Sequence, residues 1–208
     1  MKKFELTTDT KMNLGRKLFR IKALVSFGDV KEGTLGGYVE KEENLDHEGN
    51  AWVYDDAWVC GNAKVYGNAK VYRNAKVYGN ADVCGNAKVY GNVFVCDNAK
   101  VYDSAWVYGD AKVYGNADVC GNAMVCDNAW VSDNADYATV KGFGTQCRAT
   151  TFFKCKDRKI HVVCGCFKGT IEDFRKQVKA TRTGKIEKEY LMIADLMELH
   201  FEKDESEE

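Results

Sequence analysis

The sequence contains no proline, and this absence bears on the fold. Proline has no backbone N–H, so within a sheet it interrupts the ladder of hydrogen bonds between strands. A chain without proline suits an architecture in which each backbone N–H pairs with a neighbouring strand. The composition is therefore compatible with a long β-ladder.

Long apolar runs are also missing. No segment approaches the roughly 20 apolar residues that cross a bilayer as a helix. The first residues, MKKFELTTDTK, are charged and lack the apolar centre of a secretory signal. The formal net charge is −1, so neither charge sign dominates. We expect a cytoplasmic protein with no membrane contact and no long nucleic-acid partner.

Histidine is scarce, and motifs of known catalytic chemistry are absent. The three histidines are His47, His161 and His200, and their spacing does not favour the three-histidine centre of a zinc hydratase. No GxxxxGK loop, zinc-protease helix or serine-elbow motif occurs. The sequence therefore predicts no catalytic residue, no metal ion and no cofactor.

A six-residue phrase, roughly Gly-Asn-Ala-x-Val-x, repeats through the middle of the chain. Valine occupies every sixth position from Val53 to Val131, fourteen times, and Tyr137 takes the next such position. Alanine stands two residues earlier in each unit, except at Val93. A strict period this short indicates a solenoid.

Each unit reads as a short strand followed by a corner. Alanine and valine alternate with two variable residues, so the small apolar side chains share one face. The Gly-Asn pair, as in Gly61-Asn62, favours a turn because both residues tolerate left-handed backbone dihedrals. The repeat thus predicts strands with one buried face, joined at corners.

These residues resemble the hexapeptide-repeat proteins, which fold as left-handed parallel β-helices. Val65 with Ala69 fits the pattern of that family, an aliphatic residue followed four places later by a small one. The resemblance implies three units to a coil of eighteen residues. Fifteen units then give about five coils, roughly 24 Å long at about 4.8 Å per stacked strand. The implied fold class is mainly β, and it hosts acyltransferases, hydratases and inert scaffolds alike.

Folding the repeat on eighteen residues sorts the outward side chains into three faces. One face carries Trp52, Lys70, Lys88, Trp106 and Met124, beside a column of tyrosines. A second carries Trp58, Lys76, Phe94, Lys112 and Trp130. The third alternates in charge: Lys64, Asp82, Lys100, Asp118 and Asp136.

Exposed aromatic side chains on the first two faces predict contact with a partner. Self-association comes first, because β-helices of the resembling family are commonly trimers, and we expect a homotrimer. A small anionic ring, such as a nucleotide, and a host protein are the alternatives. The candidate interface residues are Trp52, Trp58, Tyr72, Tyr90, Phe94, Trp106 and Trp130.

The flanking segments differ from the repeat and predict caps. We expect an N-terminal cap over residues 1–48, the repeat over 49–140, a C-terminal α+β module over 141–203 and an acidic tail over 204–208. The cap contains a strand over 17–25, and Val39 and Leu45 fall on the alanine positions of the repeat. The module reads as strands over 150–156 and 159–166, followed by a helix after Thr170 and a second over 186–201.

Nine cysteines do not predict disulfides. Those of the repeat occupy the outward position after valine, and equivalent ones such as Cys60 and Cys96 lie two coils apart. That separation, roughly 9 to 10 Å from the strand spacing, is too long for a disulfide. A zinc site at Cys147, Cys155, Cys164 and Cys166, with His161 as a substitute, stays an alternative, although the spacing is unlike paired CxxC motifs.

Basic and aromatic residues gather in the C-terminal module and form the candidate ligand-binding cluster. The charged members would attract an anion, and the phenylalanines would stack on a ring. An ordinary apolar core with a solvated basic rim is the alternative explanation. The candidate residues are Arg148, Phe152, Phe153, Lys154, Lys156, Arg158, Phe167, Lys168 and Arg175.

The whole arrangement resembles uncharacterised hexapeptide-repeat proteins of bacteriophages and prophages, on the segments FRIKAL, LGGYVEKEENL, TTFFKCKD and VVCGCFKGTIEDF. The resemblance implies a bacterial host and a role in countering host defence. We therefore expect a non-enzymatic, homo-oligomeric binding protein that sequesters a small anionic ligand, such as a nucleotide immune signal. The alternatives are a scaffold that blocks a host protein and an acyltransferase, which the lack of histidine in the coils disfavours.

Overall fold

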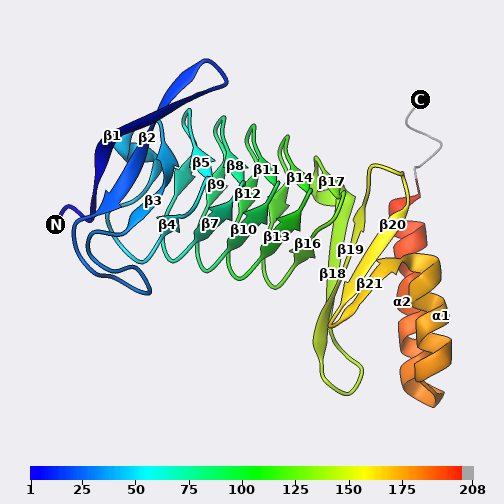
Figure 1. The fold of residues 1–208 in the computed structure, drawn as a ribbon. Helices are drawn as coiled ribbons and strands as arrows, with labels where there is room; N and C mark the ends of the chain where they lie inside the picture. Colours follow the sequence, from blue (N-terminus) through cyan, green and yellow to red (C-terminus); the bar gives the residue numbers. More distant parts are fainter. Residues whose placement is uncertain (203–208) are drawn as a thin grey trace.

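A computed structural model of the chain describes residues 1–202 and is mainly β (Figure 1). Three N-terminal strands, a parallel β-helix of about five turns and a C-terminal module of strands and helices follow one another along the molecule. The predicted fold class is confirmed. Over the described range, neither helix has both the length and the apolar character needed to cross a bilayer. The predicted acidic tail, 204–208, lies outside the described residues.

The β-helix consists of fourteen short strands that stack in three parallel sheets. Valine pairs with valine one coil on, as Val89 does with Val71 and Val107, so the predicted eighteen-residue coil is confirmed. The strands are Trp52–Val53 (β4), Trp58–Val59 (β5), Lys64–Val65 (β6), Lys70–Arg73 (β7), Lys76–Val77 (β8), Asp82–Val83 (β9), Lys88–Gly91 (β10), Phe94–Val95 (β11), Lys100–Val101 (β12), Trp106–Gly109 (β13), Lys112–Val113 (β14), Asp118–Val119 (β15), Met124–Val125 (β16) and Trp130–Val131 (β17).

The interior of the β-helix is made of the repeated alanines and valines. From Ala51 to Val131 these side chains are fully buried, and Val93 fills an alanine position without exposure. The fifteenth unit departs from the pattern, because Asn134–Asp136 forms a 3₁₀ turn (η2) and Ala135 is exposed. Asp136 therefore leaves the charged third face, which ends at Asp118 in β15.

The N-terminal residues extend one sheet of the β-helix. Strands Phe4–Asn13 (β1), Arg16–Ala23 (β2) and Leu35–Val39 (β3) precede β5 in an eight-stranded sheet. The sequence predicted β2 but not β1. A short 3₁₀ turn, Glu42–Asn44 (η1), follows β3.

Val39 and Leu45 stand opposite Val59 and Val65 and not opposite alanines. Their predicted alignment with the alanine positions is therefore wrong. The first true repeat begins only at Ala51, and the segment before it holds two residues more than the eighteen-residue spacing allows.

The C-terminal module is a four-stranded antiparallel sheet covered by two helices (Figure 1). The strands are Tyr137–Phe143 (β18), Arg148–Lys154 (β19), Ile160–Cys164 (β20) and Phe167–Thr170 (β21); the helices are Ile171–Thr181 (α1) and Gly184–Phe201 (α2). The central strands and both helices match the prediction, whereas β18 and β21 were missed. Thr170 caps α1 as predicted, its hydroxyl accepting the Asp173 N–H at 3.2 Å.

Candidate functional site

The structure separates the two central phenylalanines of the predicted ligand-binding cluster. Phe152 and Phe153 are both fully buried in β19 and belong to different cores. Phe152 packs edge-on against Phe174 of α1, and Phe153 packs against the end of the β-helix. Adjacent strand residues point to opposite faces of a sheet. Neither ring therefore has a free face on which a ligand could stack.

Three of the predicted basic residues are engaged in ion pairs. Lys154 Nζ lies 3.2 Å from Asp136 Oδ1, and Lys168 pairs with Asp127. The Arg175 guanidinium contacts Asp195 at 2.5 Å and Glu198 at 2.6 Å. These ion pairs connect different elements of the molecule. Lys156 and Arg158 are exposed in the turn between β19 and β20.

Arg148 lines a pocket at the outer end of the module. Loop 144–148, the turn between β20 and β21 and both helices enclose about 140 Å³ there. Gly165 allows the arginine to lie across that turn, because a Cβ at this residue would stand 2.5 Å from Arg148 Nη1. The lining residues are Gly144, Thr145, Gln146, Arg148, Cys164, Cys166, Phe167, Phe174, Gln177, Val178, Thr181, Arg182, Ile186 and Tyr190.

The lining of this pocket carries positive charge without a compensating carboxylate. Arg148 and Arg182 both contribute, and among residues 1–202 neither forms an ion pair. The C-terminal end of α1 and the N-terminal end of α2 both lie nearby, and their dipoles oppose each other. The two arginines therefore set the sign of the potential, and the pocket favours an anion.

Tyr190 of α2 closes the inner side of the pocket. Its hydroxyl donates to the Phe143 carbonyl at 3.3 Å. Burial raises the pKa of Tyr190, as does the neighbouring Cys164. The phenol is therefore neutral at physiological pH and adds no negative charge to the pocket.

Of the nine predicted ligand-binding residues, Arg148 and Phe167 line this pocket. Arg182, which follows α1, and Tyr190 of α2 were missed, since both are distant in sequence from Arg148. The available signal for Arg182 was a basic side chain shortly before the second predicted helix.

The outward aromatic residues lie on the predicted faces of the β-helix. Tyr72, Tyr90 and Tyr108 stack with ring centroids 4.8 and 5.1 Å apart. On the second face Lys112 lies over Trp130 at 5.0 Å, and Trp130 is 37% exposed. Both faces therefore present aromatic rings bordered by lysines.

Trp52 and Trp58 do not belong to these exposed surfaces. Trp52 is fully buried, with Phe4 and Phe27 packed against its ring. Trp58 is 3% exposed and packs with Leu18 of β2. The expectation that both offer interface area is corrected, because the N-terminal residues cover them. Tyr72, Tyr90, Phe94 and Trp106 are partly exposed.

A larger hollow near the N-terminal end of the β-helix is lined by acidic side chains. It holds about 840 Å³ and is lined by four carboxylates, from Glu42, Glu43, Asp46 and Asp82, together with Lys64 and His47. His47 stacks on Phe4 with centroids 4.4 Å apart, and its Nδ1 accepts the Lys3 N–H at 3.2 Å. An anionic ligand is repelled from this hollow.

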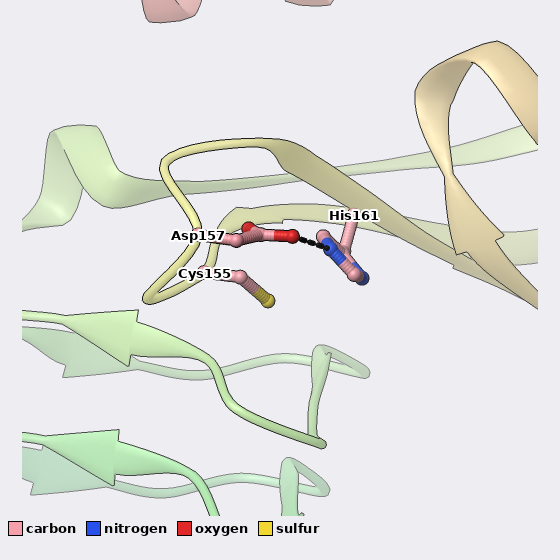
Figure 2. A group of neighbouring side chains, drawn as sticks. All are labelled: Cys155, Asp157 and His161. Atoms are coloured by element: carbon pink, nitrogen blue, oxygen red, sulfur yellow. Dashed lines mark hydrogen bonds and ion pairs between the residues drawn. The ribbon is translucent and has the colours of Figure 1, made fainter.

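A third group of polar side chains lies where the module meets the β-helix. Donor atoms of Cys155, Asp157 and His161 lie within 4.8 Å of one another (Figure 2). Asp157 Oδ2 contacts His161 Nε2 at 3.2 Å. Burial raises the pKa of Cys155 to about 12, so the thiol is protonated at neutral pH and is not an activated nucleophile.

The four cysteines considered for zinc do not converge. Cys155 faces the β-helix, whereas Cys164 packs toward the helices on the opposite side of the same sheet and accepts a bond from Thr150 at 3.1 Å. Cys147 and Cys166 are exposed in separate loops. The alternation of strand residues separates Cys155 from Cys164, and the four-cysteine alternative is corrected. All nine thiols are free.

Comparison of the chain with models of known protein families and with curated proteins finds no match.

Proposed function

We propose that the protein is a binding protein that captures a small anionic ligand in the pocket of Arg148 and Arg182. The observation that carries the proposal is the pair of arginines around one pocket whose lining has no carboxylate. A guanidinium binds carboxylate and phosphate groups through two parallel hydrogen bonds. Capture without turnover is the activity proposed.

The volume of the pocket restricts what enters it. About 140 Å³ is less than the roughly 300 Å³ at which pockets for drug-sized ligands begin. A phosphate or carboxylate group fits, whereas a whole nucleotide does not. For a nucleotide ligand, the phosphate would enter between the arginines and the base would remain outside, near the partly exposed ring of Phe167.

The resemblance to phage hexapeptide-repeat proteins supports a biological role for this binding. We propose that the protein acts in the cytoplasm of a bacterial host and sequesters a nucleotide signal of immunity. Sequestration requires stoichiometric binding and release of the ligand unchanged.

Native mass spectrometry with AMP, cyclic di-AMP and ADP-ribose tests the proposal. The wild-type protein should carry one adduct per chain with at least one of these probes. Arg148→Glu and Arg182→Glu should each lose the adduct, since each replaces a cation of the pocket with an anion. Lys156→Glu, a charge reversal in an exposed turn outside the pocket, is the matched control and should retain it.

Two outcomes contradict the proposal. Equal binding by wild-type and Arg148→Glu proteins places the ligand elsewhere. Recovery of a chemically altered ligand replaces capture by catalysis, and substitution of His47 and His161 then tests whether a histidine supplies the base.

The aromatic second face favours a second function, assembly into a homotrimer or attachment to a host protein. Trp130 and Phe94 stand on one sheet with Lys112 between them, and exposed aromatic rings favour protein contacts. Trp130→Glu combined with Phe94→Glu should yield a smaller assembly in sedimentation velocity. Lys100→Glu on the third face is the control. An unchanged assembly would exclude the second face as the subunit interface.

A further inference from the structure

Among residues 1–202, Cys155, Asp157 and His161 form a group of metal-binding side-chain types on the face of the module sheet opposite the anion pocket. Its donors are a thiol, a carboxylate and an imidazole, the three side-chain types that bind zinc. The strand register brings them together. His161 pairs with Phe153 across β19 and β20, and Cys155 follows two residues after Phe153 on the same face.

Hydrogen bonds and ring stacking fix the positions of the three donor side chains. The Cys155 N–H donates to the Lys159 carbonyl at 3.1 Å, and its own carbonyl accepts the Arg158 N–H at 2.9 Å. Asp157 Oδ1 accepts the Lys159 N–H at 3.0 Å, which leaves Oδ2 directed at His161. The ring of His161 stacks near Phe153 with an interplanar angle of 23°.

From this geometry we infer that Cys155, Asp157 and His161 form a binding site for a divalent transition-metal ion of the zinc type. The donors lie within 4.8 Å of one another, whereas metal–donor bonds of about 2.0 to 2.3 Å bring tetrahedral ligands somewhat closer. A small closure of the turn completes the site. Three protein ligands leave the fourth position to water.

The charge of the site suits a divalent cation. On binding, the Cys155 thiol releases its proton to solvent, and thiolate plus carboxylate then match the two positive charges of the ion. The exposed side chains of Lys156, Arg158 and Lys159 oppose cation binding. Both anionic ligands are therefore needed.

Metal binding here would strengthen the junction between the module and the β-helix. Cys155 bridges to Ala129 of the last coil, and the Lys156 N–H donates to the Asn128 carbonyl at 3.0 Å. Because the ion would bind the folded turn and not the unfolded chain, occupancy raises thermal stability by mass action.

Cobalt(II) titration of the full chain tests the site directly. Cys147→Ser/Cys166→Ser protein is used as the background, so that exposed thiols do not contribute. One equivalent of cobalt should produce a thiolate-to-cobalt charge-transfer band and intense visible bands of four-coordinate geometry, and zinc should displace both. In the same background, zinc should raise the melting temperature relative to a chelator.

Substitution of each ligand identifies the site. Cys155→Ser should abolish the charge-transfer band, and His161→Gln and Asp157→Asn should each weaken cobalt binding at least about tenfold, the loss expected even for a partner of a ligand. His200→Gln, an exposed histidine on α2, should bind as the background does. Because His161 and Asp157 are not fully buried, their variants test the site even if Cys155→Ser fails to fold. A missing charge-transfer band, or equal binding by the background and His161→Gln proteins, overturns the proposal.

Discussion

Single residues decide where backbones approach one another most closely, and Gly37 of β3 is the clearest case. A Cβ on Gly37 would lie 2.7 Å from Val53 Cγ1 and still closer to the carbonyl oxygen of Ala57. That carbonyl accepts the Tyr38 N–H at 2.9 Å, so it cannot move without loss of a ladder bond. Glycine is required here for space.

We expect Gly37→Ala to lower the free energy of unfolding by about 1 to 3 kcal/mol, the usual cost of overpacking a filled interior. Gly121→Asp is the matched control, since nothing lies within 4 Å of its Cβ position and aspartate already occupies equivalent left-handed corners at Asp97 and Asp103. Denaturant unfolding compares the two. Equal losses would show that the close approach of β3 is not the determinant.

Asp136 provides a pH-dependent contact between the β-helix and the module. Burial alone would raise the pKa of Asp136, but hydrogen bonds from Ser132 and the ion pair with Lys154 outweigh it and hold the pKa below its ordinary value. A carboxyl group whose pKa is lowered by folding stabilises the native state above its unfolded pKa, and that contribution is lost as pH falls.

Asp136→Asn should therefore destabilise the protein at pH 7 and pH 5 alike, and the difference from wild type should shrink below about pH 4, near the unfolded pKa of aspartate. Chemical denaturation at several pH values measures this difference in the free energy of unfolding. Asp133→Asn, in the same turn but more exposed, serves for comparison. A difference that persists undiminished at pH 3 would contradict the assigned ionic contribution.

At the scale of the element, the corners of the β-helix are joined by asparagine ladders. Asn62, Asn80, Asn98 and Asn116 form one column, each amide donating to the next side chain at 3.0 to 3.1 Å. The Gly-Asn phrase predicts turns, but these bonds between coils arise only when the eighteen-residue stacking places identical residues in register.

Asn80→Ala should remove two of these bonds and Asn116→Ala only one. We expect the free energy of unfolding to fall by about 1 kcal/mol for Asn80→Ala and by about half that value for Asn116→Ala, because a net hydrogen bond contributes on the order of 1 kcal/mol or less at an exposed position. Thermal or denaturant unfolding of the two variants provides the comparison. If the terminal substitution costs as much as the internal one, the ladder does not act as a chain of paired bonds.

At the scale of the whole molecule, the module seals the open end of the β-helix. Phe153, Cys155 and Val163 belong to the same core as the last coils. An uncovered end would expose apolar residues and strand edges, which promote end-to-end association.

Phe153→Asp should detach the module from the last coil and cause concentration-dependent association, visible in sedimentation velocity. Met192→Asp introduces the same charge into the same module at a side chain that is 69% exposed, and it should not change the assembly. Identical behaviour of the two variants would show that the module is not needed as a cap.

The sequence by itself determined the β-helix, because valine at every sixth position and alanine two residues before it leave a single consistent arrangement of the small side chains. The central hairpin and the helices of the module followed from local patterns, whereas the coil length and the three faces rested on the resemblance to hexapeptide-repeat proteins. Strand β1 and strand β21 did not, since each is an edge strand defined by its pairing with the adjoining strand more than by its own composition.

Only the tertiary structure decided which functional residues meet. The basic and aromatic cluster looked continuous in sequence, yet strand alternation sends Phe152 and Phe153 to different cores and ion pairs engage Lys154, Lys168 and Arg175. Arg182, just after α1, and Arg148 of β19 line the same pocket, and no local sequence pattern relates the two residues. Residue type and spacing establish local conformation, whereas a pocket depends on side-chain direction and on contacts between elements, which exist only in the folded chain.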